Sequence, residues 1–297
     1  MTALLLGFPD YRAPAQRLAR AAGLPWAEVG LHHFPDGESR VRLPARMPEQ
    51  VVLCQSLNRP NDKLVELILA AGAARQQGAR RITLVAPYLC YMRQDKAFQP
   101  GEAVSQRIVG AVLANWFDAL ITVDPHLHRV ARLELAVPVK PALALTASAE
   151  MSTFLAARLE TPLLIGPDAE SRQWVAAIAR ERGLEYCVAD KARLGDREVR
   201  VTLPSGHYQG RQIVLVDDMV STGRTLEAAA RALAPHRPAG ISVLVTHALF
   251  VDDALERLHR AGVDAVWSSD SIPHPSNRFE LDSLLARALR RVVVDRP

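Results

Sequence analysis

Short apolar runs alternate with longer amphipathic stretches along the whole chain. In the first half, the runs of strand length are residues 3–6, 51–55, 82–87 and 120–124, with a predicted hairpin around 32–43. Apolar residues recur at helical spacing over residues 14–22, 61–77 and 103–116. Alternation of these two periods is typical of an α/β fold with a largely parallel sheet.

The second half repeats this order. Its predicted strands are residues 163–166, 185–189, 213–217, 242–246 and 265–267, and its predicted helices are residues 147–159, 170–182, 225–234, 252–261 and 281–290. We therefore expect an α/β protein of two tandem similar domains, residues 1–140 and 141–297, each with a mostly parallel central sheet flanked by helices. The boundary falls in the proline-containing segment 137–141, where neither period continues. The alternative is one continuous doubly wound sheet.

Composition excludes several protein classes. The chain has 297 residues, of which 49% are hydrophobic and 23% charged, as in ordinary globular proteins and unlike disordered or fibrous ones. Its apolar runs are too short to span a membrane, so no membrane partner is expected. The start, MTALLLGFPDYR, lacks the features of a signal peptide, and we expect a cytoplasmic location.

The net charge indicates which class of ligand to expect, and the cysteine spacing shows whether a zinc site or disulfides are indicated. The net charge of +4 fits small anionic substrates, and the chain lacks the long basic runs with interleaved aromatic residues that favour nucleic-acid binding. The chain has three widely spaced cysteines and no CxxC motif, so neither a zinc ribbon nor a disulfide framework is indicated. They are Cys54, Cys90 and Cys187. We interpret them as buried thiols.

The strongest local signal is the segment IVLVDDMVSTGRT, residues 213–225. It predicts a strand, an acidic pair (Asp217 and Asp218), a loop of hydroxyl residues and glycine, and a helix. Backbone N–H groups at such a helix N-terminus bind a phosphate dianion, and the two carboxylates suit the hydroxyls of a sugar, so the segment indicates a pentose phosphate site. The candidate phosphate ligands are Ser221, Thr222, Gly223, Arg224 and Thr225. The alternative, a helix capped by Ser or Thr, explains the hydroxyls and leaves the acids unexplained.

This segment resembles the ribose 5-phosphate loop shared by type I phosphoribosyltransferases and ribose-phosphate pyrophosphokinases. Five further motifs resemble the pyrophosphokinases in order and spacing: HFPDGE (33–38), PYLCYMRQDK (87–96), VDPH (123–126), GPD (166–168) and DKAR (190–193). The resemblance runs from about Leu5 to Leu289. It implies two phosphoribosyltransferase type I-like domains.

The resemblance also implies an ATP site. The residues that match it are Phe34, Asp36, Glu38, Arg93, Gln94 and Asp95. An aromatic ring can stack on adenine, and an arginine can hold phosphate through two hydrogen bonds. In the family the first three reach in from a neighbouring subunit, which implies a homodimer or a higher homo-oligomer. The alternatives are core packing for Phe34 and a hairpin turn for Asp36 and Gly37.

Two further pairs of residues match the family's metal and catalytic positions. His126 and Asp168 match its magnesium-associated positions, and each follows an apolar strand. Mg²⁺ prefers oxygen ligands and keeps several waters, so we expect Asp168 to act largely through water. Lys191 and Arg193 match the basic pair of the catalytic loop, whose charges would stabilise the transition state of diphosphoryl transfer; the alternative is two surface cations. His128 matches no role.

Some segments depart from the common bacterial and mammalian enzymes. Residues 97–105 lack their Arg-rich continuation, and Ser221 replaces an acid, as in the archaeal-type form. Allosteric regulation by phosphate and ADP is therefore not inferred from the resemblance. Pro125 stands where leucine is more usual.

The resemblance implies a magnesium-dependent enzyme that transfers the β,γ-diphosphoryl group of ATP to the 1-hydroxyl of ribose 5-phosphate. The products are 5-phosphoribosyl 1-diphosphate (PRPP) and AMP, for nucleotide biosynthesis. No GxxxxGK[ST] motif occurs, so ATP would bind outside a P-loop. The alternatives are a type I phosphoribosyltransferase that consumes PRPP, and a catalytically silent regulatory relative.

Overall fold

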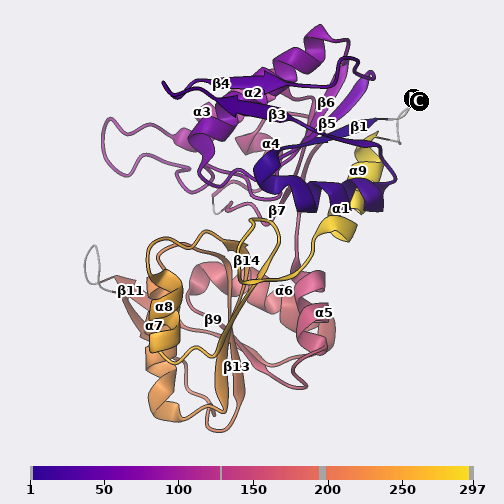
Figure 1. The fold of residues 1–297 in the computed structure, drawn as a ribbon. Coiled ribbons are helices and arrows are strands. Elements are labelled where there is room, and N and C mark those ends of the chain that lie inside the picture. Colours follow the sequence, from indigo (N-terminus) through magenta and orange to yellow (C-terminus); the bar gives the residue numbers. More distant parts are fainter. Residues whose placement is uncertain (1–2, 128, 194–198, 294–297) are drawn as a thin grey trace. The chain divides into compact units, whose positions relative to one another are not determined.

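The computed structural model describes residues 3–127, 129–193 and 199–293. These form two compact units, one of residues 1–146 with 281–297 and one of residues 147–280 (Figure 1). The predicted domain ranges differ from these units in two respects. They assign residues 141–146 and the C-terminal segment from residue 281 to the second domain, whereas the structure groups both with the first unit.

The first unit has a six-stranded sheet in which every pairing is parallel. In spatial order its strands are β2 (Trp26–Glu28), β1 (Leu4–Gly7), β5 (Gln50–Cys54), β6 (Arg81–Val85), β7 (Ala119–Val123) and β8 (Ala142–Leu145). Strands β3 (Gly30–His33) and β4 (Ser39–Arg42) pair antiparallel as the predicted hairpin.

The helices of this unit include one from the far end of the chain. They are η1 (Pro9–Tyr11), α1 (Arg12–Ala22), α2 (Pro60–Gln76), α3 (Ser105–Trp116), α4 (Leu133–Ala136) and α9 (Asp282–Val293). Helix α9 buries Leu285 and Leu289 and lies beside α1 (Figure 1). Arg290 also donates a hydrogen bond to the Ala21 carbonyl over 2.9 Å. This packing explains why α9 belongs to the first unit.

The second unit repeats the topology of the first. Its parallel sheet contains, in spatial order, β10 (Tyr186–Val188), β9 (Leu163–Gly166), β13 (Gln212–Val220), β14 (Gly240–Ala248), β15 (Ala265–Ser269) and β16 (Asn277–Phe279). Strands β11 (Asp190–Arg193) and β12 (Val199–Thr202) form an antiparallel pair at the place that β3 and β4 occupy in the first unit. The prediction of two similar α/β domains is confirmed, and the single continuous sheet is wrong.

Helices cover both faces of the second sheet. They are α5 (Ser148–Ala156), η2 (Ala169–Ser171), α6 (Arg172–Arg182), α7 (Arg224–Leu233), η3 (Ala234–His236) and α8 (Ala254–Arg260). Alternate residues of β13 enter different cores: Ile213 and Leu215 pack with the residues of α7 and α8, and Val214 and Val216 with those of α5 and α6. Helices α7 and α8 lie on one side of the sheet, and α5 and α6 lie on the other (Figure 1). Burial on both faces explains the uninterrupted apolar run of this strand. A strand buried on both faces also gives a rigid support to the residues that follow β13 in the sequence.

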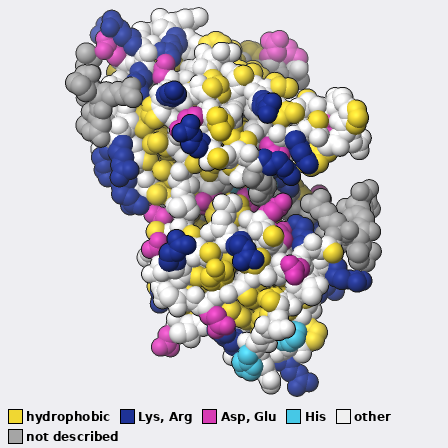
Figure 2. Space-filling model, turned by 180° about the vertical axis from the view of Figure 1, so that it is seen from behind, with side chains coloured by type: hydrophobic (Ala, Val, Ile, Leu, Met, Phe, Trp, Pro, Cys, Tyr) yellow, Lys and Arg dark blue, Asp and Glu magenta, His cyan; other side chains and the backbone are white. Residues whose placement is uncertain are grey.

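The surface carries charges of both signs. On the face shown in Figure 2, Lys and Arg side chains occur in separate groups, with Asp and Glu side chains between them.

Cys54 and Cys90 are buried as predicted, and burial raises the pKa of Cys90 to about 12. Cys187 is only partly buried, so the prediction was wrong for this residue. Within the described ranges, no helix has both the length and the apolar character needed to cross a bilayer.

Candidate active site

The acidic pair lies inside β13 rather than at its end. The predicted strand stops at residue 217, but β13 continues to Val220 because β14 pairs with it as far as Ala248. Although they are consecutive strand residues, the side chains of Asp217 and Asp218 lie close enough to interact. Asp217 accepts a hydrogen bond from the Asp218 N–H (3.0 Å), and Asp218 accepts one from the Met219 N–H (2.8 Å).

A three-residue loop, 221–223, joins β13 to α7. Gly223 forms the N-cap of α7 with φ of 70°, a left-handed conformation that glycine adopts without steric cost. Because glycine has no side chain, the helix has no side-chain cap at this position. The interpretation of the hydroxyl residues as a Ser or Thr N-cap is therefore wrong. The loop therefore leads directly into a helix N-terminus, the kind of position at which backbone N–H groups can bind an anion.

Asp168 and Lys191 lie together in the same unit. Asp168 follows β9 and caps η2, where one carboxylate oxygen accepts from the N–H groups of Glu170 (3.0 Å) and Ser171 (3.2 Å). Its other oxygen accepts from the Lys191 ammonium over 2.6 Å. The structure thus joins a predicted metal residue to a predicted catalytic residue. Arg193 ends β11, but its side chain lies outside the described residues, as do residues 194–198 and His128.

Negative charge accumulates around this pair. Burial raises the pKa of Asp217 well above its ordinary value, and the like charges of Asp218 and Asp168 raise it further. Three carboxylates therefore interact in the second unit, with the Lys191 ammonium as a bound cation. Among the described residues no three His, Cys, Asp or Glu side chains form a metal cage. Such a sparse set fits Mg²⁺, which is usually bound by one or two carboxylates together with substrate phosphates.

The hairpin that carries the HFPDGE motif is closed by its own turn. Phe34 and Gly37 make the backbone hydrogen bonds of the turn, and the Asp36 carboxylate accepts from the Glu38 N–H over 3.1 Å. The turn interpretation of Asp36 and Gly37 is therefore confirmed. Phe34 is 38% exposed, so its interpretation as a core residue is wrong. An exposed aromatic ring on a closed hairpin can bind a flat ligand.

The three residues of the RQD motif differ in their surroundings. Gln94 accepts from the Ser105 hydroxyl (2.8 Å), and the buried Asp95 accepts from Arg129 (2.7 Å). Arg93 is exposed. Gln94 and Asp95 thus fix the loop that presents Arg93, and Arg93 has the charge and exposure that a phosphate ligand requires.

His126 lies in the first unit, in the loop after β7, and is partly buried. The preceding Asp124 has φ of 37°, and its N–H donates to the Leu145 carbonyl over 2.8 Å. Asp168 belongs to the second unit. The shared metal role of His126 and Asp168 therefore stays a prediction.

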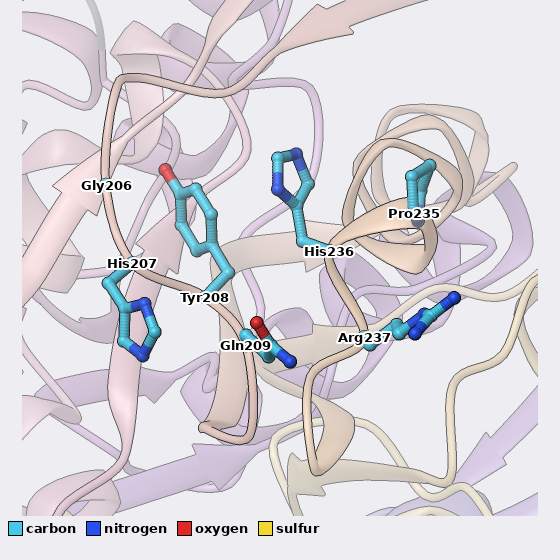
Figure 3. A pocket seen from close by; sticks show the side chains of 7 residues that line it. All are labelled: Gly206, His207, Tyr208, Gln209, Pro235, His236 and Arg237. Carbon is cyan, nitrogen blue, oxygen red and sulfur yellow. The ribbon is translucent and has the colours of Figure 1, made fainter.

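A polar cavity lies away from these residues. It measures about 400 Å³ and is lined by Gly206, His207, Tyr208, Gln209, Pro235, His236 and Arg237 (Figure 3). These residues precede β13 and follow α7, so the cavity lies at the opposite end of β13 from the 221–223 loop. The Tyr208 ring lies edge-on to His236, and its hydroxyl donates to the Pro204 carbonyl over 2.5 Å. No predicted site residue lines this cavity.

One residue beside the loop was missed by sequence reasoning. Arg257, on α8, donates a hydrogen bond from Nη2 to the Thr222 carbonyl over 2.6 Å. An arginine on an amphipathic helix ordinarily faces solvent, so the sequence offers no signal that distinguishes it.

Comparison with known proteins covers nearly the whole chain. Residues 4–116 match the model for the N-terminal domain of ribose phosphate pyrophosphokinase, and residues 143–282 match the phosphoribosyl transferase domain. The chain is 36% identical over 280 residues to a ribose-phosphate pyrophosphokinase of Methanopyrus kandleri, covering 93% of this chain and 95% of the relative. It is 32% identical over 289 residues to one of Halobacterium salinarum, covering 96% of this chain and 100% of the relative.

The fold has a solved counterpart. The structure of phosphoribosylpyrophosphate synthetase from Mycobacterium smegmatis superposes with a TM-score of 0.84 at 23% identity, covering 98% of this chain and 99% of that one. The first family model matches the N-terminal half of the chain, and the second matches the C-terminal half. Together with the archaeal relatives, they show that the chain belongs to the ribose-phosphate pyrophosphokinase family of enzymes.

Proposed function

We propose that this chain transfers the β,γ-diphosphoryl group of ATP to the 1-hydroxyl of ribose 5-phosphate in the presence of Mg²⁺. The observation that carries the proposal is the arrangement in the second unit. There an acidic pair and an anion-binding loop on β13 and α7 occur together with the Asp168–Lys191 ion pair. In this proposal the acidic pair binds the sugar hydroxyls, the loop binds the phosphate dianion, and the ion pair lies at the transferring phosphoryl group.

In this proposal the 221–223 loop and the first turn of α7 hold the 5-phosphate. Their backbone N–H groups point to the anion, and the hydroxyls of Ser221, Thr222 and Thr225 with the charge of Arg224 add donors. Asp217 and Asp218 accept hydrogen bonds from the ribose hydroxyls. The sugar is then fixed at both ends, with its 1-hydroxyl oriented for attack.

The transfer step breaks one bond and forms one bond. The 1-hydroxyl oxygen attacks the β-phosphorus of ATP, the bond from that phosphorus to the bridging oxygen of AMP breaks, and the hydroxyl proton is released. Lys191, with Arg193, stabilises the negative charge that develops on the phosphoryl oxygens. Asp168 would hold Mg²⁺, and His126 is the second residue that we propose for this role; the ion would neutralise phosphate charge.

The first unit supplies the ATP-binding segments in this proposal. The exposed Phe34 stacks on adenine, and the exposed Arg93 binds phosphate, with Asp36, Glu38, Gln94 and Asp95 completing or supporting the site. Because the Phe34 hairpin serves a neighbouring subunit's site, the active form is a homodimer or a larger homo-oligomer. We place the enzyme in the cytoplasm, where it acts in nucleotide biosynthesis.

Phosphorus NMR tests the proposal. Purified protein with Mg²⁺, ATP and ribose 5-phosphate should give AMP and the anomeric diphosphate of PRPP in equal amounts. Omission of ribose 5-phosphate is the control and should abolish AMP formation. Binding of ribose 5-phosphate without either product would contradict the proposal, and pyrophosphate release from PRPP and a nucleobase without ATP would favour a phosphoribosyltransferase.

A further inference from the structure

The backbone of the 221–223 loop is held by α8 and by the segment that precedes this helix. The Val251 N–H donates to the Ser221 carbonyl over 3.3 Å, and Arg257 donates to the Thr222 carbonyl over 2.6 Å. The carbonyls of Ser221 and Thr222 therefore face Val251 and α8, respectively. In a trans peptide the C=O and the following N–H point in opposite directions. The N–H groups of Thr222 and Gly223 are thus turned away from α8, toward the side where an anion can bind.

The Arg257 guanidinium is itself fixed in place. Its Nη1 forms an ion pair with Asp253, the N-cap residue of α8, and its Nε lies 3.5 Å from a carboxylate oxygen of Glu227 on α7. The side chain is only 25% exposed. A planar guanidinium that is held by two carboxylates has little rotational freedom, so the direction of its Nη2 N–H groups is fixed.

We propose that Arg257 is a positioning residue that sets the anion-binding conformation of the 221–223 loop. This inference rests on the proposed function, in which the loop holds the 5-phosphate of ribose 5-phosphate. Without Arg257 the Thr222 carbonyl loses its donor, and the peptide between Thr222 and Gly223 is free to rotate. Rotation would turn the Gly223 N–H away from the phosphate.

Two neighbouring arginines are matched controls. Arg231 shares Glu227 with Arg257, at 3.2 and 2.9 Å, and Arg260 shares Asp253, at 3.4 Å. Their hydrogen bonds go to side chains of α7 and α8. Replacing either removes one cation from the same charge network and leaves the bond to Thr222 intact.

Isothermal titration calorimetry of the full chain with ribose 5-phosphate and Mg²⁺ tests the inference. Arg257→Met should weaken binding about tenfold to a hundredfold, the effect of losing one charge-assisted hydrogen bond. Arg257→Lys should recover part of the loss because an ammonium can still donate to the carbonyl. Arg231→Met and Arg260→Met should bind within about twofold of the wild type, since exposed ion pairs contribute little. In steady-state kinetics the KM for ribose 5-phosphate should rise while the KM for ATP stays unchanged.

The outcomes separate the inference from the proposed function. Equal binding by folded Arg257→Met and wild type overturns the positioning role, as does an equal loss in Arg231→Met. A wild type that does not bind ribose 5-phosphate overturns the proposed function, and the positioning role with it. If Arg257→Met does not fold, Arg257→Lys carries the comparison, and wild-type affinity in that variant overturns the inference.

Discussion

Replacing Lys191 with methionine should abolish most of the activity and leave the fold nearly intact. Lys63 offers an internal comparison. It pairs with Asp10, which follows β1 as Asp168 follows β9, and the two Nζ–Oδ2 distances are both 2.6 Å. Lys63 also donates to the Ser56 carbonyl and to the Asn58 side chain, both over 2.8 Å. All three of its donors are thus used inside the protein.

The contacts set the size of each effect. A hydrogen bond to a charged group contributes about 1.5–3 kcal/mol, and Asp168 keeps its two backbone donors, so Lys191→Met should cost about 1–2 kcal/mol of unfolding free energy. Loss of a cation at the reacting phosphoryl group should lower turnover by roughly 10²–10³, or about 2.7–4 kcal/mol. Lys63→Met loses three such hydrogen bonds and should cost roughly 3–6 kcal/mol of stability, with turnover within about threefold of the wild type.

Two assays measure these quantities. Urea denaturation gives the unfolding free energies, and the rate of AMP formation at saturating ATP and ribose 5-phosphate gives turnover. The reasoning is refuted if Lys191→Met keeps turnover within about threefold of the wild type. It is also refuted if folded Lys63→Met loses as much turnover as Lys191→Met.

Three further predictions concern single residues. Asp217→Asn should raise the melting temperature at pH 7, because the raised pKa of Asp217 makes ionisation of this carboxyl costly in the folded state. The gain should shrink as the pH falls toward 3.8, the ordinary pKa of the group, because the wild-type carboxyl is then protonated. Thermal unfolding of both proteins across this pH range measures the difference. Gly223→Ala, at φ of +70°, should cost about 1–2 kcal/mol in urea denaturation and weaken ribose 5-phosphate binding in calorimetry. Phe34→Ala should weaken ATP binding in calorimetry while the unfolding free energy changes by less than about 0.5 kcal/mol, because the ring is exposed.

The sheets were largely predictable because their central strands are continuous apolar runs. Their limits depend on pairing, which a local pattern does not contain: β13 reaches Val220 because β14 runs beside it. Strand β8 follows the proline-containing boundary segment and is recognisable only by its pairing with β7. The periodicity of α9 predicted a helix, but an amphipathic face does not specify that its partner is α1.

The candidate site likewise has parts that the local sequence predicts and parts that depend on tertiary packing. The Asp217–Thr225 segment is contiguous, so its chemistry could be predicted from residue types alone. The support that Arg257 gives to the Thr222 carbonyl joins residues 35 positions apart, and it depends on the packing of α8 against α7. Asp95 was predicted in the ATP site, but its pairing with Arg129 could not be predicted because it requires the loop conformation.

The most direct test of the central claim follows the β-phosphorus of ATP. Protein with Mg²⁺, ribose 5-phosphate and ATP carrying ³²P at the β position should transfer the label to PRPP and leave AMP unlabelled. This distribution requires attack at the β-phosphorus and excludes transfer of the γ-phosphoryl group alone. Recovery of the label in ADP, or in unreacted ATP while ribose 5-phosphate binds, would contradict the account.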